Sequence, residues 1–235
     1  MKNVRYIAEN ITISNDTKLT GLNNNDLIIG ASGAGKTGGY VIPNIQNITG
    51  SMVVSDTKGR LCKMFKAELE AKGYDVYTLD FVDPLKSCGY NPFDGIRRYP
   101  DGKYREQDIL TLANTLMPCL DRIEPFWEQA AASYIAFLIS YCLEALVPEE
   151  HNMVGLCKLH QTFIKPGGEL SFMEWVERNP DSFASKKYHK IESITKADRT
   201  WSCILEFANR AFEPFEFKEV HHIFKNENCF DILRV

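Results

Sequence analysis

The sequence predicts an α/β fold in which a partial parallel sheet is followed by an all-helical block. Three observations predict it. Short apolar runs alternate with helical spacing over residues 5–81, which is the order expected of βαβ units. From about Pro92 onward helical spacing dominates. The composition, with 44% hydrophobic and 25% charged residues, is that of an ordinary globular protein and excludes disordered, collagen-like and coiled-coil classes.

The first part of the chain predicts strands and helices in alternation. A strand is expected over 5–13, and turn residues follow at 21–25. Buried strands are expected at three short apolar runs bounded by turn residues. These runs are 26–29, 51–56 and 75–81. Helices are expected over 36–45 and 59–72, the second of them stopping before Gly73.

The second part predicts helices separated by proline and glycine. They cover 108–117, 125–147, 153–164, 170–178 and 197–212. The longest uncharged run, 129–143, is shorter than the roughly 20 apolar residues of a bilayer span, so we expect a buried helix in a soluble chain. A last strand is expected over 228–235. We therefore predict a sheet domain over 1–95, a helical domain over 96–212 and a return towards the sheet over 213–235.

Charge and cysteine content narrow the function classes. The net charge of −4 gives no general basic signal, so any nucleic-acid contact must be local or shared among subunits. The 7 cysteines are dispersed, which predicts free thiols in a reducing compartment and argues against a disulfide frame or a zinc site. Four of them lie in apolar, helix-like runs and are expected to be buried: Cys119, Cys142, Cys157 and Cys203.

Residues 30–37 carry the sharpest motif, a full match to G-x-x-x-x-G-K-[ST]. Its members are Gly30, Ala31, Ser32, Gly33, Ala34, Gly35, Lys36 and Thr37. The glycines let the backbone curl so that consecutive N–H groups form an anion nest, and the following helix adds its positive end. Lys36 is expected to reach the β- and γ-phosphates as the catalytic cation, and the Thr37 hydroxyl to bind Mg²⁺. The motif predicts a P-loop nucleotide-binding core that takes ATP and Mg²⁺.

Hydrolysis also needs an acidic residue near the Mg²⁺ ion. Asp56 follows the better of the apolar runs and is the first candidate, although it fits the role of a cap on the following helix equally well. Asp80, after the next run, is the weaker candidate.

Three further clusters have a plain structural interpretation beside a functional one. An aromatic stripe has the spacing of a base-stacking surface but is more typical of a core face: Phe126, Trp127, Tyr134, Phe137 and Tyr141. A basic cluster fits phosphate contact but is more typical of a solvated helix face: Lys186, Lys187, His189 and Lys190. The pair His221 and His222 lacks the partners of a metal site.

Beyond the loop, several short motifs occur together. They are Gly38-Gly39-Tyr40-Val41-Ile42-Pro43-Asn44-Ile45, Asp56-Thr57-Lys58-Gly59-Arg60, Gly89-Tyr90-Asn91-Pro92-Phe93 and Pro125-Phe126-Trp127-Glu128. With Gly21-Leu22-Asn23-Asn24-Asn25 before the first buried run, this combination resembles the TraG-type coupling proteins of type IV secretion systems over about residues 20–215. Those proteins are conjugative DNA-transfer ATPases related to the FtsK and HerA DNA pumps.

The resemblance implies a RecA-like motor domain interrupted by an all-helical domain. It also implies membrane-associated homo-hexamers at the cytoplasmic face of the cell membrane, which receive relaxase-bound single-stranded DNA and use ATP to move it into the secretion channel. Arg60 stands where the family has glutamate. The family's membrane anchor and the half with an Asp-Glu motif are missing, so we expect a cytoplasmic fragment that does not itself contact the membrane. Such a fragment should bind ATP but hydrolyse it poorly alone.

Two alternatives stay open at the level of sequence. A small-molecule kinase with a helical lid would carry an arginine-rich lid, whereas the helical block has only scattered basic residues such as Arg97, Arg98 and Arg122. The other alternative is a docking module, in which the helical block binds a protein partner and the phosphate loop is silent.

Overall fold

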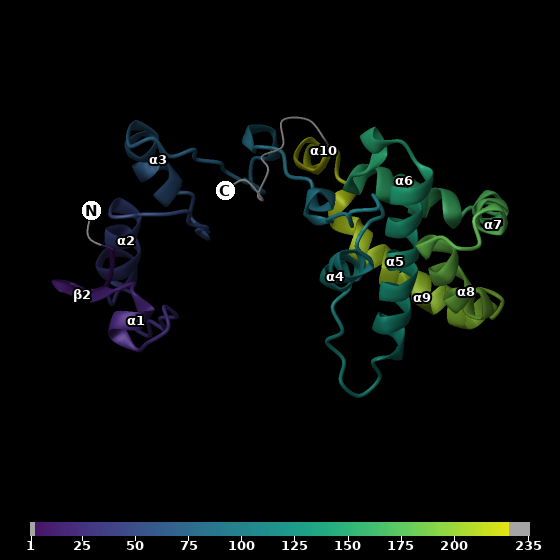
Figure 1. Ribbon diagram of the computed structural model, residues 1–235, viewed down its shortest axis with the longest axis horizontal. Helices are drawn as coiled ribbons and strands as arrows, with labels where there is room; N and C mark the ends of the chain where they lie inside the picture. The colour runs from purple at the N-terminus through teal and green to yellow at the C-terminus, as the bar shows by residue number, and fades with distance from the viewer. Residues whose placement is uncertain (1–2, 226–235) are drawn as a thin grey trace. The chain divides into compact units, whose positions relative to one another are not determined.

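The computed structural model describes residues 3–225, which form two compact units divided between Thr78 and Leu79 (Figure 1). This division falls earlier in the chain than the predicted domain boundary at residue 95, which remains a prediction. The first unit carries the phosphate loop, and the second holds the long helices.

The first unit opens with a two-stranded antiparallel hairpin, β1 (Val4–Ala8) and β2 (Ile11–Ser14). The single strand expected over 5–13 is therefore wrong. The chain reverses at Asn10, whose φ of 61° lies in the left-handed region that asparagine tolerates better than most residues. A short helix, α1 (Thr17–Thr20), follows, and the Asp16 carboxylate caps it by accepting the N–H groups of Lys18 and Leu19.

The helix predicted after the phosphate loop is confirmed, but it opens irregularly. A π-helical turn covers Thr37–Val41, and α2 (Ile42–Gln46) continues from it. Pro43 has no N–H group to offer to the preceding turn, which favours such a local change of hydrogen-bond pattern. The helix predicted over 59–72 is confirmed as α3 (Leu61–Ala71), and Gly73 follows it with a φ of 87°.

The three apolar runs expected as buried strands are not strands in the described part of the chain. Of the residues the structure describes, β1 and β2 form the one sheet, and 26–29, 51–56 and 75–81 join no ladder. Leu27 is 84% exposed and Val53 is 93% exposed. A buried parallel strand needs paired neighbours and helices over both faces, and the described part of this unit does not supply them. The parallel sheet therefore remains a prediction.

The second unit is helical, and the five helices predicted for it are confirmed to within about 2 residues at either end. The confirmed helices are α4 (Glu106–Leu116), α5 (Phe126–Ala145), α6 (Met153–Phe163), α7 (Glu169–Arg178) and α9 (Asp198–Phe212). Two more, α8 (Phe183–Thr195) and α10 (Lys218–Phe224), lie outside the five predicted ranges. The last of these, with a short turn at Glu213–Phe215, occupies the start of the segment predicted to return to the sheet. The strand predicted over 228–235 lies outside the described residues.

Helix α5 is the centre of this unit, with α4, α6, α8 and α9 around it (Figure 1). It is apolar on all sides, as expected of a helix that is surrounded by others. Phe137 is fully buried and its ring meets those of Phe163, Phe172 and Tyr188 at centroid distances of 5.8, 6.1 and 5.3 Å. The core interpretation of the aromatic stripe is therefore confirmed for Phe137 and its neighbours, while Phe126 at the helix start is 49% exposed.

One histidine is built into this apolar core. His160 is 1% exposed, its Nε2 atom lies 2.8 Å from Asn209 Oδ1, and its Nδ1 atom lies 2.9 Å from the Tyr134 hydroxyl. The amide oxygen can only accept, so Nε2 carries the proton and Tyr134 donates to Nδ1. The imidazole also stacks on Phe212 at 4.5 Å. These contacts select the neutral ring, and burial lowers the pKa of His160 below its ordinary value of 6.5.

The cysteine predictions are only partly correct. Cys142 and Cys157 are buried, and burial raises the pKa of each thiol to about 12. Cys119 and Cys203 are exposed, because they lie in a loop and on the outer face of α9. In the described part of the chain no three His, Cys, Asp or Glu side chains gather as a metal site. None of the helices between residues 3 and 225 combines the length and apolar character of a membrane span.

The neutral His160 makes the stability of the protein depend on pH. In the unfolded chain this histidine gains a proton as the pH falls below about 6.5, whereas the folded chain resists protonation, so the free energy of unfolding should fall below that pH. Urea unfolding at pH 7.5 and 5.5 measures this, with His160→Gln as the variant and His222→Gln, at an exposed position, as the matched control. Equal acid sensitivity of His160→Gln and wild type would contradict the prediction.

Candidate nucleotide-binding site

The phosphate loop has the curled backbone that its glycines predict. Gly33 and Gly35 have φ angles of 79° and 77°, which side-chain-bearing residues rarely adopt. Ala34 closes the curl by donating its N–H to the Ala31 carbonyl at 3.2 Å. Among the described residues, the N–H groups of Gly33, Gly35 and Lys36 donate to no protein acceptor. A loop with three unused donors fits an anion of several oxygens such as a triphosphate.

Lys36 lies over the loop to which it belongs. Its ammonium donates to the carbonyls of Gly30 at 2.5 Å and Ala31 at 2.8 Å. A Cβ atom at Gly30 would lie 3.1 Å from Ala34 Cβ, a tight contact that only a small shift of Ala34 would relieve. The spacing between Gly30 and Lys36 thus brings the lysine charge back to the start of the loop.

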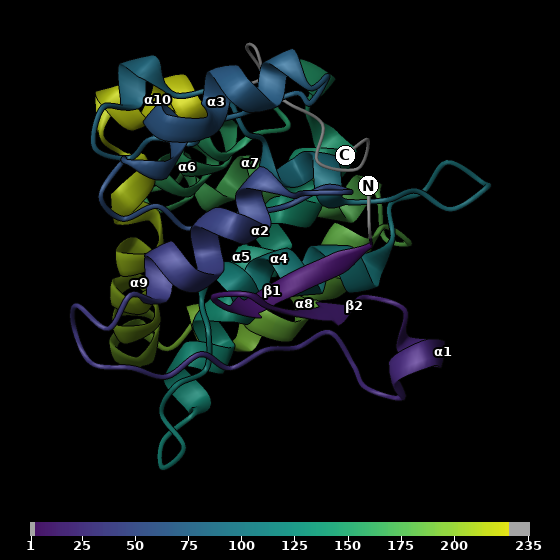
Figure 2. The ribbon, with the colours of Figure 1, turned by 90° about the vertical axis from the view of Figure 1, so that its left-hand side faces the viewer.

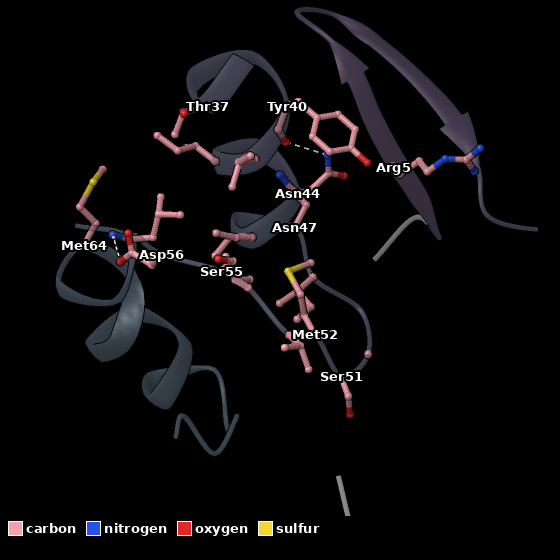
Figure 3. A pocket seen from close by; sticks show the side chains of 18 of the residues that line it. Arg5, Thr37, Tyr40, Asn44, Asn47, Ser51, Met52, Ser55, Asp56 and Met64 are labelled. Carbon is pink, nitrogen blue, oxygen red and sulfur yellow. Dashed lines mark hydrogen bonds between the residues drawn. The ribbon is translucent and has the colours of Figure 1, made fainter. Parts of the chain in front are cut away.

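A hollow of about 930 Å³ lies beside the helix that follows the loop (Figure 3). Thr37 and Asp56, the two predicted Mg²⁺ ligands, both line it, and so do the cationic residues Lys58 and Arg60. Residues 30–36 do not line it. The structure therefore brings the two predicted ligands to one hollow, with a cationic wall suited to phosphate oxygens.

Asp56 caps the helix that follows it. Its Oδ2 atom accepts the N–H groups of Leu61 at 2.7 Å and Cys62 at 3.2 Å, in the first turn of α3. Burial alone would raise the pKa of Asp56, but backbone N–H groups, that of Cys62 first among them, outweigh burial and lower it. The capping interpretation is confirmed, and the carboxylate is held ionised. Its role as a Mg²⁺ ligand remains a prediction.

Asp80, the weaker candidate, belongs to the second unit. Its Oδ1 atom accepts the N–H groups of Val82 and Asp83, both at 2.9 Å, which makes it part of a local turn.

The basic cluster and the histidine pair lie on two helices of the second unit. In the cluster on α8, Lys187 is only 9% exposed, with its ammonium 5.0 Å from the Phe183 ring centroid, so the expectation of a fully solvated face is wrong for this residue. His189 lies 3.3 Å from Glu192. His221 and His222 lie on α10.

Asn44 ties the loop helix to the N-terminal hairpin, a role that the residue pattern does not reveal. Its Oδ1 atom accepts the Tyr6 N–H at 2.9 Å, and its Nδ2 atom donates to the Tyr6 carbonyl at 2.7 Å. The Nδ2 atom also donates to the Tyr40 carbonyl at 2.7 Å (Figure 3). An asparagine side chain has the donor and acceptor of a peptide group, so it pairs with β1 as a neighbouring strand would. The sequence pointed to Asn44 only through the Pro43-Asn44 pair after the loop, which does not identify Tyr6 as its partner.

Arg5 makes a second tie, to the segment that leads into the loop. Its guanidinium lies 2.8 Å from Asp26 Oδ2, with both side chains almost buried, and also donates to Asn24 Oδ1 at 2.9 Å. Tyr40 from the loop helix reaches the same Asp26 oxygen at 3.1 Å, and burial, followed by this hydrogen bond, raises the pKa of Tyr40. The segments on both sides of the phosphate loop are therefore fixed to one hairpin.

Comparison with known proteins gives one match. The family model for type IV secretory system conjugative DNA transfer matches residues 6–234. No curated protein matches the chain.

The Asn44 tie predicts a measurable change in backbone protection. Asn44→Ala removes three hydrogen bonds and leaves the Tyr6 N–H without its acceptor, which should destabilise the first unit by about 1–3 kcal/mol. Amide hydrogen exchange at Tyr6 should speed up by about tenfold or more. The matched control is Asn47→Ala, which removes one exposed bond to the Pro43 carbonyl. Unchanged exchange at Tyr6 in Asn44→Ala would contradict the tie.

Proposed function

Because the chain belongs to the type IV secretory system conjugative DNA transfer family, we propose that it is the ATP-binding part of a coupling ATPase. Such an enzyme recruits relaxase-bound single-stranded DNA and drives it through the secretion channel. The observation that carries the nucleotide proposal is the curled loop over 30–37 with its unused N–H donors. The same proposal assigns the apolar runs at 26–29, 51–56 and 75–81 to a RecA-like parallel sheet.

The proposed binding step uses groups of this chain alone. The N–H groups of Gly33, Gly35 and Lys36 take phosphate oxygens, and the Lys36 ammonium exchanges the carbonyls of Gly30 and Ala31 for the β- and γ-phosphates. The Thr37 hydroxyl, with Asp56 as the further ligand, is suited to Mg²⁺ because hard cations prefer oxygen. When bound, Mg²⁺ neutralises charge on the phosphates.

Turnover and transport belong to the assembly in this proposal. We assign the full protein to a homo-hexamer at the cytoplasmic face of the bacterial membrane, in which an arginine of a neighbouring subunit stabilises the charge that develops during hydrolysis. The isolated chain then binds ATP and hydrolyses it slowly.

One observation favours a second candidate function, that of a docking module. The helical unit has its own core around α5 and forms a compact unit distinct from the phosphate loop. Capture of relaxase–DNA by the Lys36→Ala chain, unchanged from wild type and indifferent to ATP, would favour this candidate over the coupling ATPase.

Removing the loop lysine should strongly weaken nucleotide binding. Titration of a fluorescent ATP analogue is expected to give an affinity at least about 100-fold lower for Lys36→Ala, because a desolvated charge–phosphate contact is lost. Lys63→Ala, an equal loss of charge on the exposed face of α3, is the matched control and should bind as wild type does. Equal affinity for Lys36→Ala and wild type would refute the nucleotide proposal.

The Mg²⁺ ligands can be separated from the capping role of Asp56. Asp56→Asn keeps an oxygen for the N–H groups of Leu61 and Cys62 but removes the negative charge, so α3 should persist while the gain in analogue affinity on adding Mg²⁺ shrinks. Thr37→Ala should likewise lose that gain, and Thr37→Ser should keep it. Circular dichroism checks the fold. A full Mg²⁺ effect in Asp56→Asn would leave this residue with the capping role alone.

A further inference from the structure

A basic and aromatic hairpin leads into α4 in the second unit. Arg98 and Tyr104 form its antiparallel bridge, and the Tyr99 and Arg105 N–H groups donate to the carbonyls of Lys103 and Arg97 at 2.7 and 2.8 Å. Its turn is Pro100-Asp101-Gly102, in which Gly102 has a φ of 85° and donates to the Tyr99 carbonyl at 2.9 Å. Figure 2 shows this hairpin extending away from the helices of its own unit.

The side of the hairpin turned toward its own unit is anchored. The Arg98 guanidinium lies 3.9 Å from the Tyr104 ring centroid and bonds to the Tyr104 hydroxyl, and that hydroxyl lies 3.3 Å from His151 Nδ1. His151 Nε2 lies 3.1 Å from the Leu146 carbonyl, which can only accept. Tyr104 is therefore the donor to His151, and this chain of bonds fixes the hairpin on the helical core.

The opposite side presents cations around one exposed ring. Side chains alternate along paired strands, so Arg97, Tyr99, Lys103 and Arg105 share this second face. Tyr99 is 45% exposed, Lys103 is exposed, and the Arg105 guanidinium lies 5.7 Å from the Tyr99 ring centroid.

The carboxylates near this face leave part of its charge uncompensated. Arg97 and Asp108 form a bidentate ion pair with hydrogen bonds of 2.7 and 2.8 Å, and the hydrogen bond from Arg97 lowers the pKa of Asp108 to about 2. Asp101 Oδ1 accepts the Lys103 N–H within the turn. Arg105 forms no ion pair among the described residues, and its Nε is the one buried side-chain nitrogen or oxygen there without a hydrogen-bond partner. Because no described carboxylate forms an ion pair with Arg105, its guanidinium charge remains available to an anion.

We propose that this face of the hairpin binds single-stranded DNA, with one base stacked on Tyr99 and the adjacent phosphates held by Lys103 and Arg105. Stacking on an exposed ring requires an unpaired base, and cations on both sides of the ring suit the backbone that continues past it. Residues 97–105 hold four cationic side chains and one carboxylate in a chain of net charge −4, so the attraction is local. The inference rests on the proposed function, because it names a contact for the transported strand.

The test measures fluorescence anisotropy of a labelled oligothymidylate with the full chain and without nucleotide. Tyr99→Ala should weaken binding by about tenfold, while Tyr99→Phe, which keeps the ring, should bind as wild type does. Lys103→Ala should weaken binding by a few-fold. It should also reduce the slope of log K against log salt concentration by about 0.7 in magnitude, the value for one phosphate contact on a single strand. On an abasic strand, Tyr99→Ala should have no effect.

Two controls remove positive charge elsewhere. Lys165→Ala changes an exposed loop lysine, and the double variant Lys186→Ala with Lys190→Ala removes the exposed part of the cluster on α8. Both should bind DNA as wild type does. The proposal would be overturned if Tyr99→Ala and Lys103→Ala bound the oligothymidylate with wild-type affinity, or if only the α8 variant lost affinity. It would also be overturned if polyglutamate competed with the labelled DNA as well as unlabelled DNA does. Lys36→Ala should keep its DNA affinity, so a failure of the nucleotide proposal and a failure of this one give different results.

Discussion

A backbone N–H group that leaves water needs another acceptor, and the two units meet this requirement in different ways. In the helical unit nearly all of the chain from α4 to α10 satisfies its own backbone, so side chains alone decide how the helices pack around α5. In the first unit, Asn44 supplies a side-chain amide on the edge of β1 that does not pair with β2, and the phosphate loop keeps three donors unused. Paired backbone N–H groups stabilise the helical unit, whereas the unpaired N–H groups of the phosphate loop can accept a ligand as their partner.

Local patterns predicted those features that depend on a few neighbouring residues. Helices α4, α6 and α9 beside α5 follow from apolar spacing and from the prolines and glycines that separate them, whereas α8 was not among the predicted ranges. The curl of the loop follows from Gly33 and Gly35. The reversal at Asn10 and the hairpin closed by Asp101-Gly102 were missed, although Asp-Gly is a known turn signal. In both places a turn signal was present, but it was weak beside the surrounding sequence. At Asn10 the surrounding residues alternate as in one strand, and around Asp101-Gly102 they are mostly charged.

Contacts between distant segments could not be predicted from such patterns. Asn44 bonds to Tyr6, and Arg5 bonds to Asp26, across long stretches of chain. Neither an asparagine nor an arginine indicates by its type which distant residue it will contact. Cys203 shows the converse error, since an apolar run does not say which of its residues faces outward. For the runs around Leu27 and Val53, apolar composition predicted burial, but burial of a strand depends on partners that must come from elsewhere.

The position of Lys36 has a thermodynamic consequence. Its ammonium already has two carbonyl acceptors at 2.5 and 2.8 Å, so a ligand that recruits it replaces one set of bonds with another. The net gain from this charge is the difference between the two sets and is far smaller than the gross strength of a lysine–phosphate contact. A single phosphate gains little from such an exchange, whereas a polyphosphate offers the ammonium several oxygens at once. Under the proposed function, the loop would therefore discriminate by ligand length, because the ligand competes with the carbonyls of Gly30 and Ala31.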